Sequence, residues 1–201
     1  MITGIMVFSL AMTGTGLSQE WATALSYQIS IPSGDTKDFT GATSFRGMGL
    51  DLRYKVDTDT RVGLFFGWNV FYERVEETAE LKTDHPGAVT GTQDRYINAF
   101  PIMLSVQRFF GQTGGTQPYA GLNLGGFIMS QTFDIGLSRV TDDQWQWGGA
   151  PELGIKIPLQ YDTSLMINGK YNYAFSGESV LGNDINNSYW VIGIGVAWAG
   201  Y

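Results

Sequence analysis

The sequence predicts an all-β protein, an eight-stranded antiparallel up-and-down transmembrane β-barrel. Three observations indicate it: apolar residues recur at every second position, about eight segments share this pattern, and the connections between them alternate between short and long. Only 15% of the 201 residues are charged, although 43% are hydrophobic. Soluble domains carry about 25% charged residues, so this composition favours strands with one face in lipid.

The alternation is clearest around residues 46–55. Met48, Leu50 and Leu52 share one face there, while Asp51 and Arg53 share the other. A helix would instead repeat its apolar residues every three or four positions. Each segment has about the 9–11 residues that a tilted strand needs to cross a bilayer. The predicted strands cover residues 21–30, 45–55, 61–73, 96–110, 118–133, 147–159, 165–175 and 188–198.

The connections support the same architecture. Residues 56–60, 111–117 and 160–164 form short connections rich in turn-forming residues, whereas residues 31–44, 74–95, 134–146 and 176–187 form long ones. Strict alternation is typical of a barrel with short periplasmic turns, long external loops and both termini in the periplasm. We expect no second domain.

The first residues are typical of a secretory signal. Residues 4–12 form an apolar run, and Gly16-Leu17-Ser18 is a small-x-small cleavage pattern before Gln19. No Lys or Arg precedes the run, and the alternative is an apolar N-terminal strand or helix. We expect a signal peptide over residues 1–18 and a barrel domain over residues 19–201. No other stretch has the length of a spanning helix, so insertion must use strands.

Alternation alone also fits a soluble lipocalin-like ligand-binding barrel, whose apolar face points inward. Three features favour the inverted arrangement: glycines crowd the polar face, its charges can pair, and aromatic residues end the apolar face. The predicted lumen network comprises Asp51, Arg53, Lys55, Gln107, Asn123, Glu152, Lys156, Asn168, Lys170 and Asn172. The predicted lipid-facing residues are Leu50, Leu52, Leu64, Phe66, Leu153, Ile155, Ile192 and Ile194. The predicted aromatic girdle comprises Tyr54, Trp68, Tyr72, Phe100, Tyr119, Tyr171, Tyr173, Trp190 and Trp198.

The polar face is interpreted as a structural core, with a proton or ion path or a ligand site as the alternative. The chain has no cysteine, which removes Cys-based metal sites and nucleophiles. Its net charge of −7 argues against nucleic acid as a partner. No motif for a cofactor, a metal or a catalytic group is present. The single His85 lies beside a Pro-Gly turn with no Ser nearby in sequence, and we expect a solvated loop residue.

The chain resembles the small outer-membrane barrels of the OmpA-like, OmpX and OmpW superfamily. The signal-like start, the alternating strands and the terminal segment 189–198 carry the resemblance. In that family the last strand is an assembly signal, which Gly193, Val196 and Trp198 match, although Val191 stands where a large polar residue is usual. The resemblance implies the outer membrane of a Gram-negative-type bacterium, with outer-membrane lipid, lipopolysaccharide and the barrel assembly machinery as partners.

The functional hypothesis is a structural or interaction role, in which a barrel filled by side chains displays long acidic external loops to an unidentified protein partner. The alternatives are a narrow channel or binding barrel for a small or hydrophobic solute, and an enzyme that modifies outer-membrane lipid. The acidic run over residues 73–84 could also bridge divalent cations to lipopolysaccharide, although solvated loop charges are the default.

Overall fold

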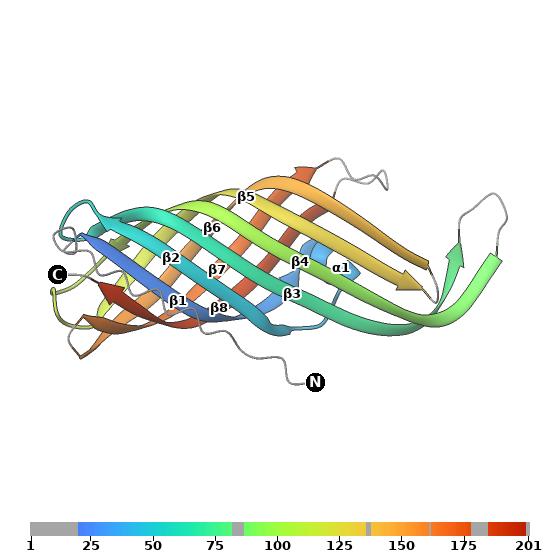
Figure 1. Cartoon of the computed structure of the whole chain (residues 1–201), viewed down its shortest axis with the longest axis horizontal. Coiled ribbons are helices and arrows are strands. Elements are labelled where there is room, and N and C mark those ends of the chain that lie inside the picture. The colour runs from blue at the N-terminus through green and yellow to red at the C-terminus, as the bar shows by residue number, and fades with distance from the viewer. Residues whose placement is uncertain (1–19, 82–86, 136–137, 161, 178–184, 200–201) are drawn as a thin grey trace, which may run out of the picture.

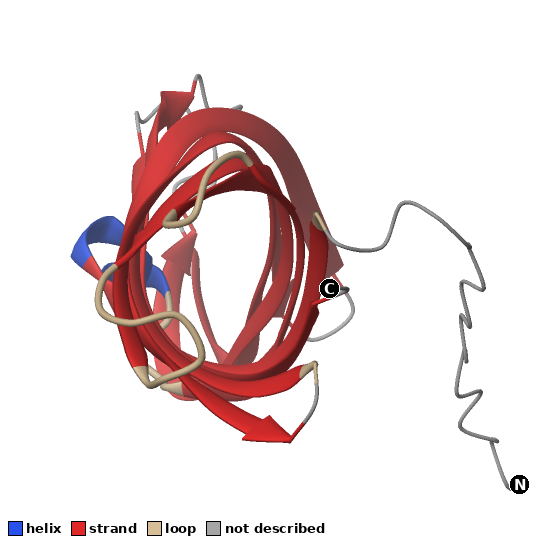
Figure 2. Cartoon of the chain, turned by 90° about the vertical axis from the view of Figure 1, so that its left-hand side faces the viewer, coloured by secondary structure: helices blue, strands red, loops and turns tan. Residues whose placement is uncertain are grey.

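The computed structural model describes residues 20–81, 87–135, 138–160, 162–177 and 185–199. Each strand pairs antiparallel with the next in sequence, and β1 pairs with β8, so the sheet closes into the predicted eight-stranded barrel (Figures 1 and 2). This confirms the fold class. The expected signal peptide lies outside the described residues. The elements are β1 (Trp21–Ser33), α1 (Gly34–Phe39), β2 (Ser44–Lys55), β3 (Thr60–Leu81), β4 (Gly87–Phe109), β5 (Gln117–Ile135), β6 (Ser138–Gln160), β7 (Thr163–Gly177) and β8 (Ile185–Ala199).

The period of two along each strand separates the two faces of the wall. On β1, Ala24, Ser26 and Gln28 are buried inside, whereas Leu25 and Tyr27 are exposed outside. The interior is therefore polar in large part and the outer wall apolar, the reverse of a water-soluble barrel. The soluble lipocalin-like alternative is wrong for this reason.

An apolar belt with aromatic residues at both edges surrounds the barrel. Leu104, on the part of β4 that crosses the belt, leaves 68% of its surface on the outer wall. Trp21 contacts Tyr54 at the edge that carries the short turns, with 5.3 Å between ring centroids. Tyr171 contacts Trp190 at the opposite edge, at 4.7 Å. Because Trp and Tyr favour the boundary between lipid and water, these pairs mark the two membrane surfaces.

Four strands continue beyond the far edge of the belt. The β2–β3 ladder ends at Gly47↔Asn69, but the β3–β4 ladder runs on to Leu81↔Gly87. Likewise, the β5–β6 ladder reaches Ile135↔Ser138, whereas the recorded β6–β7 pairs start at Gly148↔Ala174. We call residues 70–81, 87–98, 130–135 and 138–143 the external extension, which projects at the right of Figure 1. It is one four-stranded sheet, since β4 and β5 stay paired up to Gln93↔Ile135.

The external extension corrects the sequence-based prediction of loops over residues 74–95 and 134–146. Both regions are mainly strand, and they form the ends of two long hairpins. Outside the membrane both faces of a sheet meet water, so the alternation of apolar and polar residues disappears. Without that pattern, a charged strand cannot be distinguished from a loop by periodicity.

The helix α1 lies at the same end, on the other side of the rim (Figure 1). The hydroxyl of the buried Thr36 donates to Asn187 Oδ1 at 3.2 Å and accepts from the Ser188 N–H at 2.9 Å. These bonds fix the β1–β2 connection to β8. Among the described residues, no helix has both the length and the hydrophobicity to cross a membrane.

Candidate functional site: the filled lumen

The centre of the lumen is the carboxylate of Glu152, whose side chain is fully enclosed. Its Oε1 accepts hydrogen bonds from Gln107 Nε2 at 3.1 Å, Tyr119 Oη at 2.9 Å and Asn168 Nδ2 at 2.9 Å. Its Oε2 accepts one from Asn123 Nδ2 at 3.2 Å. These four donors lie on β4, β5 and β7, so the carboxylate of Glu152 on β6 joins four consecutive strands of the wall.

Two cations share this carboxylate. Lys170 Nζ lies 3.6 Å from Glu152 Oε2, and Arg53 Nη2 lies 4.0 Å from the same oxygen. Arg53 also donates to Asp51 Oδ1 at 2.6 Å. The set therefore holds two carboxylates and two cations and is electrically neutral. Burying a charge costs desolvation free energy, and pairing with an opposite charge offsets that cost.

The hydrogen bonding is incomplete. The ammonium of Lys170 has an ion pair but no hydrogen bond, and it lies 3.4 Å from the centroid of the Phe65 ring. The ring thus supplies a cation–π contact in place of a hydrogen-bond acceptor. Arg53 Nε and Asn168 Oδ1 are also buried without partners.

Strand register and two glycines position the network. Glu152 is the direct cross-strand neighbour of both Gly121 and Lys170. A Cβ on Gly154 would lie 2.6 Å from the hydroxyl oxygen of Tyr119, and a Cβ on Gly193 would lie 2.2 Å from Asn168 Oδ1. A side chain at either position would force the donor to shift, so the two glycines let Tyr119 and Asn168 reach Glu152 as they do. This explains why glycines crowd the inner face.

Apolar layers close the lumen on both sides of the network. Toward the short turns lie Phe109, Tyr119 and Met166 with two alanines. Toward the external extension lies a larger buried cluster that includes Phe65, Phe127 and Tyr189. An eight-stranded barrel is only wide enough to be filled by side chains. Side chains thus fill the described lumen at the network and on both sides of it; Figure 2 draws only the ribbon and leaves these side chains out.

The structure places most of the predicted lumen residues in this interior, where Asp51, Arg53, Gln107, Asn123, Glu152, Asn168, Lys170 and Asn172 are buried. Two others lie apart from it. Lys55 is exposed at the short-turn rim, and Lys156 is half-buried there, so neither touches Glu152. Both follow the inward parity, but Lys55 is the last residue of β2 and Lys156 lies near the end of β6, where the side chain meets water.

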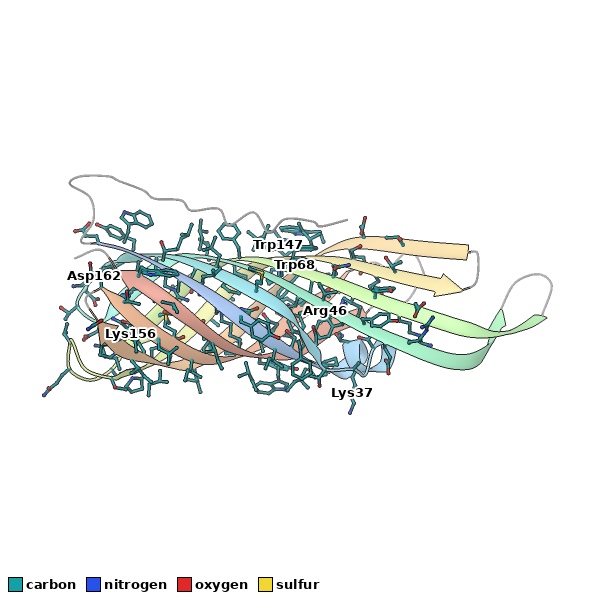
Figure 3. All side chains as sticks on the ribbon, turned by 60° about the horizontal axis from the view of Figure 1, so that its bottom comes forward. Lys37, Arg46, Trp68, Trp147, Lys156 and Asp162 are labelled. Atoms are coloured by element: carbon teal, nitrogen blue, oxygen red, sulfur yellow. The ribbon has the colours of Figure 1, made fainter. Side chains whose placement is uncertain are left out.

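The predicted lipid-facing residues all lie on the outer wall; Leu64, Leu153, Ile192 and Ile194 are exposed, and Leu50, Leu52, Phe66 and Ile155 are half-buried by their neighbours. The aromatic residues Tyr54, Trp68, Tyr72, Phe100, Tyr171, Tyr173, Trp190 and Trp198 also point outward, and Figure 3 shows Trp68 on this wall. Of the assembly-signal residues, Val196 and Trp198 face outward and Gly193 faces the lumen.

Tyr119 is the one predicted girdle residue that points into the lumen, so its assignment to the girdle was wrong. It was expected in the girdle, but only 2% of its surface is exposed and it donates to Glu152. Its parity matches that of Gly121 and Asn123, both inward positions. That parity was the signal that should have placed it in the lumen, whereas its aromatic character suggested the membrane surface. His85 and much of the acidic run over residues 73–84 lie among residues whose side chains are outside the description.

The apolar belt and the closed backbone ladder define a class. In a bilayer every backbone group must be paired internally, which a closed barrel achieves, and the outer wall must be apolar. The chain meets both conditions. It is an integral β-barrel of the kind that spans the outer membrane of Gram-negative bacteria, with a lumen filled by a neutral polar network.

Comparison with solved structures agrees with this class. The chain is similar to Neisserial surface protein A, with a TM-score of 0.57 and 16% identity over 89% of this chain and 96% of that one. It is also similar to the N-terminal β-barrel domain of OprF from Pseudomonas aeruginosa, with a TM-score of 0.52 and 15% identity over 90% and 98% of the two chains. A third similar structure is the outer membrane protein OprG of the same organism, with a TM-score of 0.52 and 19% identity over 90% of this chain and 96% of that one.

At these identities the similarity concerns the fold, and it confirms the resemblance to small outer-membrane barrels at that level. No protein-family model matches the sequence, and no curated protein sequence matches it.

Proposed function

We propose that this protein is a closed membrane scaffold that presents the external extension to a protein partner outside the cell. The observation that carries the proposal is the external extension itself. It raises four strands beyond the belt on one side of the barrel only, while β7, β8, β1 and β2 end near the rim.

The edge and charge of the external extension describe the partner. In the described residues, the segment 74–81 of β3 pairs only with β4, so its second edge can accept an added strand. Residues 70–95 contain the acids Glu73, Glu76, Glu77, Glu80, Asp84 and Asp94 against the bases Arg74, Lys82 and Arg95. An extended segment with a basic flank would match both features.

The filled lumen supports a scaffold over a transporter. A solute would have to displace the phenylalanines that close both sides of the network and to separate Glu152 from its donors. The narrow channel is the second hypothesis, and no described feature favours it. Contact with lipopolysaccharide and recognition by the assembly machinery stay predictions.

The register allows an experiment that removes most of the external extension and leaves the barrel intact. Glu73 and Arg95 are direct cross-strand partners, as are Thr132 and Thr141. Residues 74–94 and 133–140 can therefore each be replaced by Asn-Gly, which closes a hairpin with a two-residue turn. Heat-modifiable migration in a detergent gel checks that the trimmed barrel folds.

Cells that display the full or the trimmed barrel are then tested for adhesion to an array of purified extracellular proteins. We expect one or more proteins of the array to retain cells with the full barrel, and trimming to abolish retention. Equal retention by the trimmed barrel would contradict the proposal. Steady single-channel conductance of the full barrel in planar bilayers would favour the channel instead.

A further inference from the structure

The short-turn mouth of the barrel carries an unpaired positive charge that neither the lumen network nor the external extension explains. Lys55 on β2 and Arg61 on β3 are direct cross-strand neighbours at inward positions. Lys156 joins them from β6, and Figure 3 shows it at the short-turn end. We call these three residues the mouth cations.

One aromatic ring brings two mouth cations together. Arg61 Cζ lies 4.9 Å from the centroid of the Phe109 ring, and Lys156 Nζ lies 5.9 Å from the same centroid. Phe109 in turn packs against Tyr119, with 5.0 Å between ring centroids, so the floor of the mouth is closed. Arg61 and Lys156 therefore share one apolar floor.

Two acidic residues at this end are engaged elsewhere. Glu20 accepts a hydrogen bond from the Tyr54 hydroxyl at the outer rim. Asp57 accepts from the N–H groups of Asp59 and Thr60 within its own turn, at 2.8 Å and 2.7 Å. Asp59 and Asp162 lie in turns. Within the described residues, none of the mouth cations forms an ion pair.

This arrangement is costly without a ligand. Like charges on directly opposed residues destabilise a sheet, and here Lys55 opposes Arg61 in a protein whose net charge is −7. A bound anion would remove the repulsion and supply the missing acceptors. A guanidinium with two ammonium groups suits an oxyanion with more than one negative charge.

We infer that the mouth cations bind a phosphate-type oxyanion on the periplasmic side of the membrane. Short turns face the periplasm in barrels of this class. The phosphate can belong to a soluble molecule or to a lipid headgroup of the inner leaflet, because the chemistry of recognition is the same. The inference is independent of the external extension and its partner.

The test measures the affinity of pyrophosphate for the purified barrel by isothermal titration in octyl glucoside, a detergent without phosphate. We expect saturable binding that weakens as the salt concentration rises. Arg61→Gln and Lys156→Gln should each weaken it about tenfold or more, since each removes one of three charges. In contrast, the Arg61→Gln variant should be at least as stable as the wild type when pyrophosphate is absent.

Arg108 supplies a matched control, because it lies beside Arg61 at the same end of the barrel but on the exposed outer wall. Arg108→Gln makes the same charge change and should leave the affinity for pyrophosphate within about twofold. A second arm compares nanodiscs of phosphatidylcholine with nanodiscs containing phosphatidic acid, and reads thermal unfolding of the barrel with and without Arg61→Gln.

The outcomes separate the two sources. Binding of pyrophosphate that depends on Arg61 and Lys156 supports a soluble phosphate. Stabilisation by phosphatidic acid alone, lost in Arg61→Gln, supports a lipid headgroup. No binding in either arm, or an equal loss in Arg108→Gln, overturns the inference.

Discussion

The replacement Glu152→Gln tests the role of the lumen network most directly. It removes one negative charge from a set of two carboxylates and two cations, and it leaves the ammonium of Lys170, only 1% exposed, with a ring contact and no anion within 4.0 Å. Breaking a buried pair by removing one partner costs about 3–5 kcal/mol. Gln keeps a carbonyl oxygen for the donors at Oε1, so we expect the lower value. A loss of about 3 kcal/mol raises the unfolding constant about a hundredfold.

The assay is reversible urea unfolding in phospholipid vesicles, followed by tryptophan fluorescence. Glu20→Gln is the control, because it makes the same change at an exposed rim residue and should alter the unfolding free energy little. In the double variant Glu152→Gln with Lys170→Met, both charges are gone and part of the loss should be recovered. If Glu152→Gln is as stable as the wild type, or if the two single effects simply add, the network does not stabilise the barrel as described.

Three further predictions use the same unfolding assay. Leu104→Arg puts a charge in the middle of the belt and should cost about 2–4 kcal/mol, whereas Leu104→Phe should be tolerated; equal effects would argue against lipid contact. Gly154→Val should displace Tyr119 and lower the unfolding free energy by about 1–3 kcal/mol. The loss should be smaller in a Tyr119→Ala background, and an equal loss there would refute the close approach of Gly154 to the Tyr119 hydroxyl. The Asp57 carboxylate accepts backbone hydrogen bonds from Asp59 and Thr60 that lower its pKa below 3.8. It therefore stabilises the fold above its unfolded pKa and loses this contribution as the pH falls through the lowered value, so Asp57→Ala should be less stable than the wild type at neutral pH and equal to it in acid.

Alternation in the sequence was enough to predict the strand count, the closure and the direction in which most side chains point. It worked because lipid and lumen impose opposite demands on successive residues, as at Leu52 and Arg53. It failed at Tyr119, where residue type was preferred over parity. It also failed over residues 74–95, where water on both sides of the sheet removes the demand that produces the pattern.

The contacts inside the lumen could not be predicted from the sequence at all. Glu152 meets Lys170 through direct register on neighbouring strands, but it meets Arg53 from β2 across the barrel. Which residues face each other across a barrel depends on the stagger of its strands, which no local pattern records. Lys55 and Lys156 were assigned to one network with Glu152 for the same reason.

The ladder between β1 and β8 has a consequence for biogenesis. It joins Ala22 to Ala199 and Ser33 to Ser188, so the seam unites the two segments farthest apart in the described sequence. Until β8 arrives, β1 and β7 each present a row of unpaired N–H and C=O groups, which hydrocarbon penalises by several kcal/mol per group. Sealing and entry into the bilayer must therefore be coupled, and substitutions along this seam should reduce the yield of inserted protein before they lower the stability of the finished barrel.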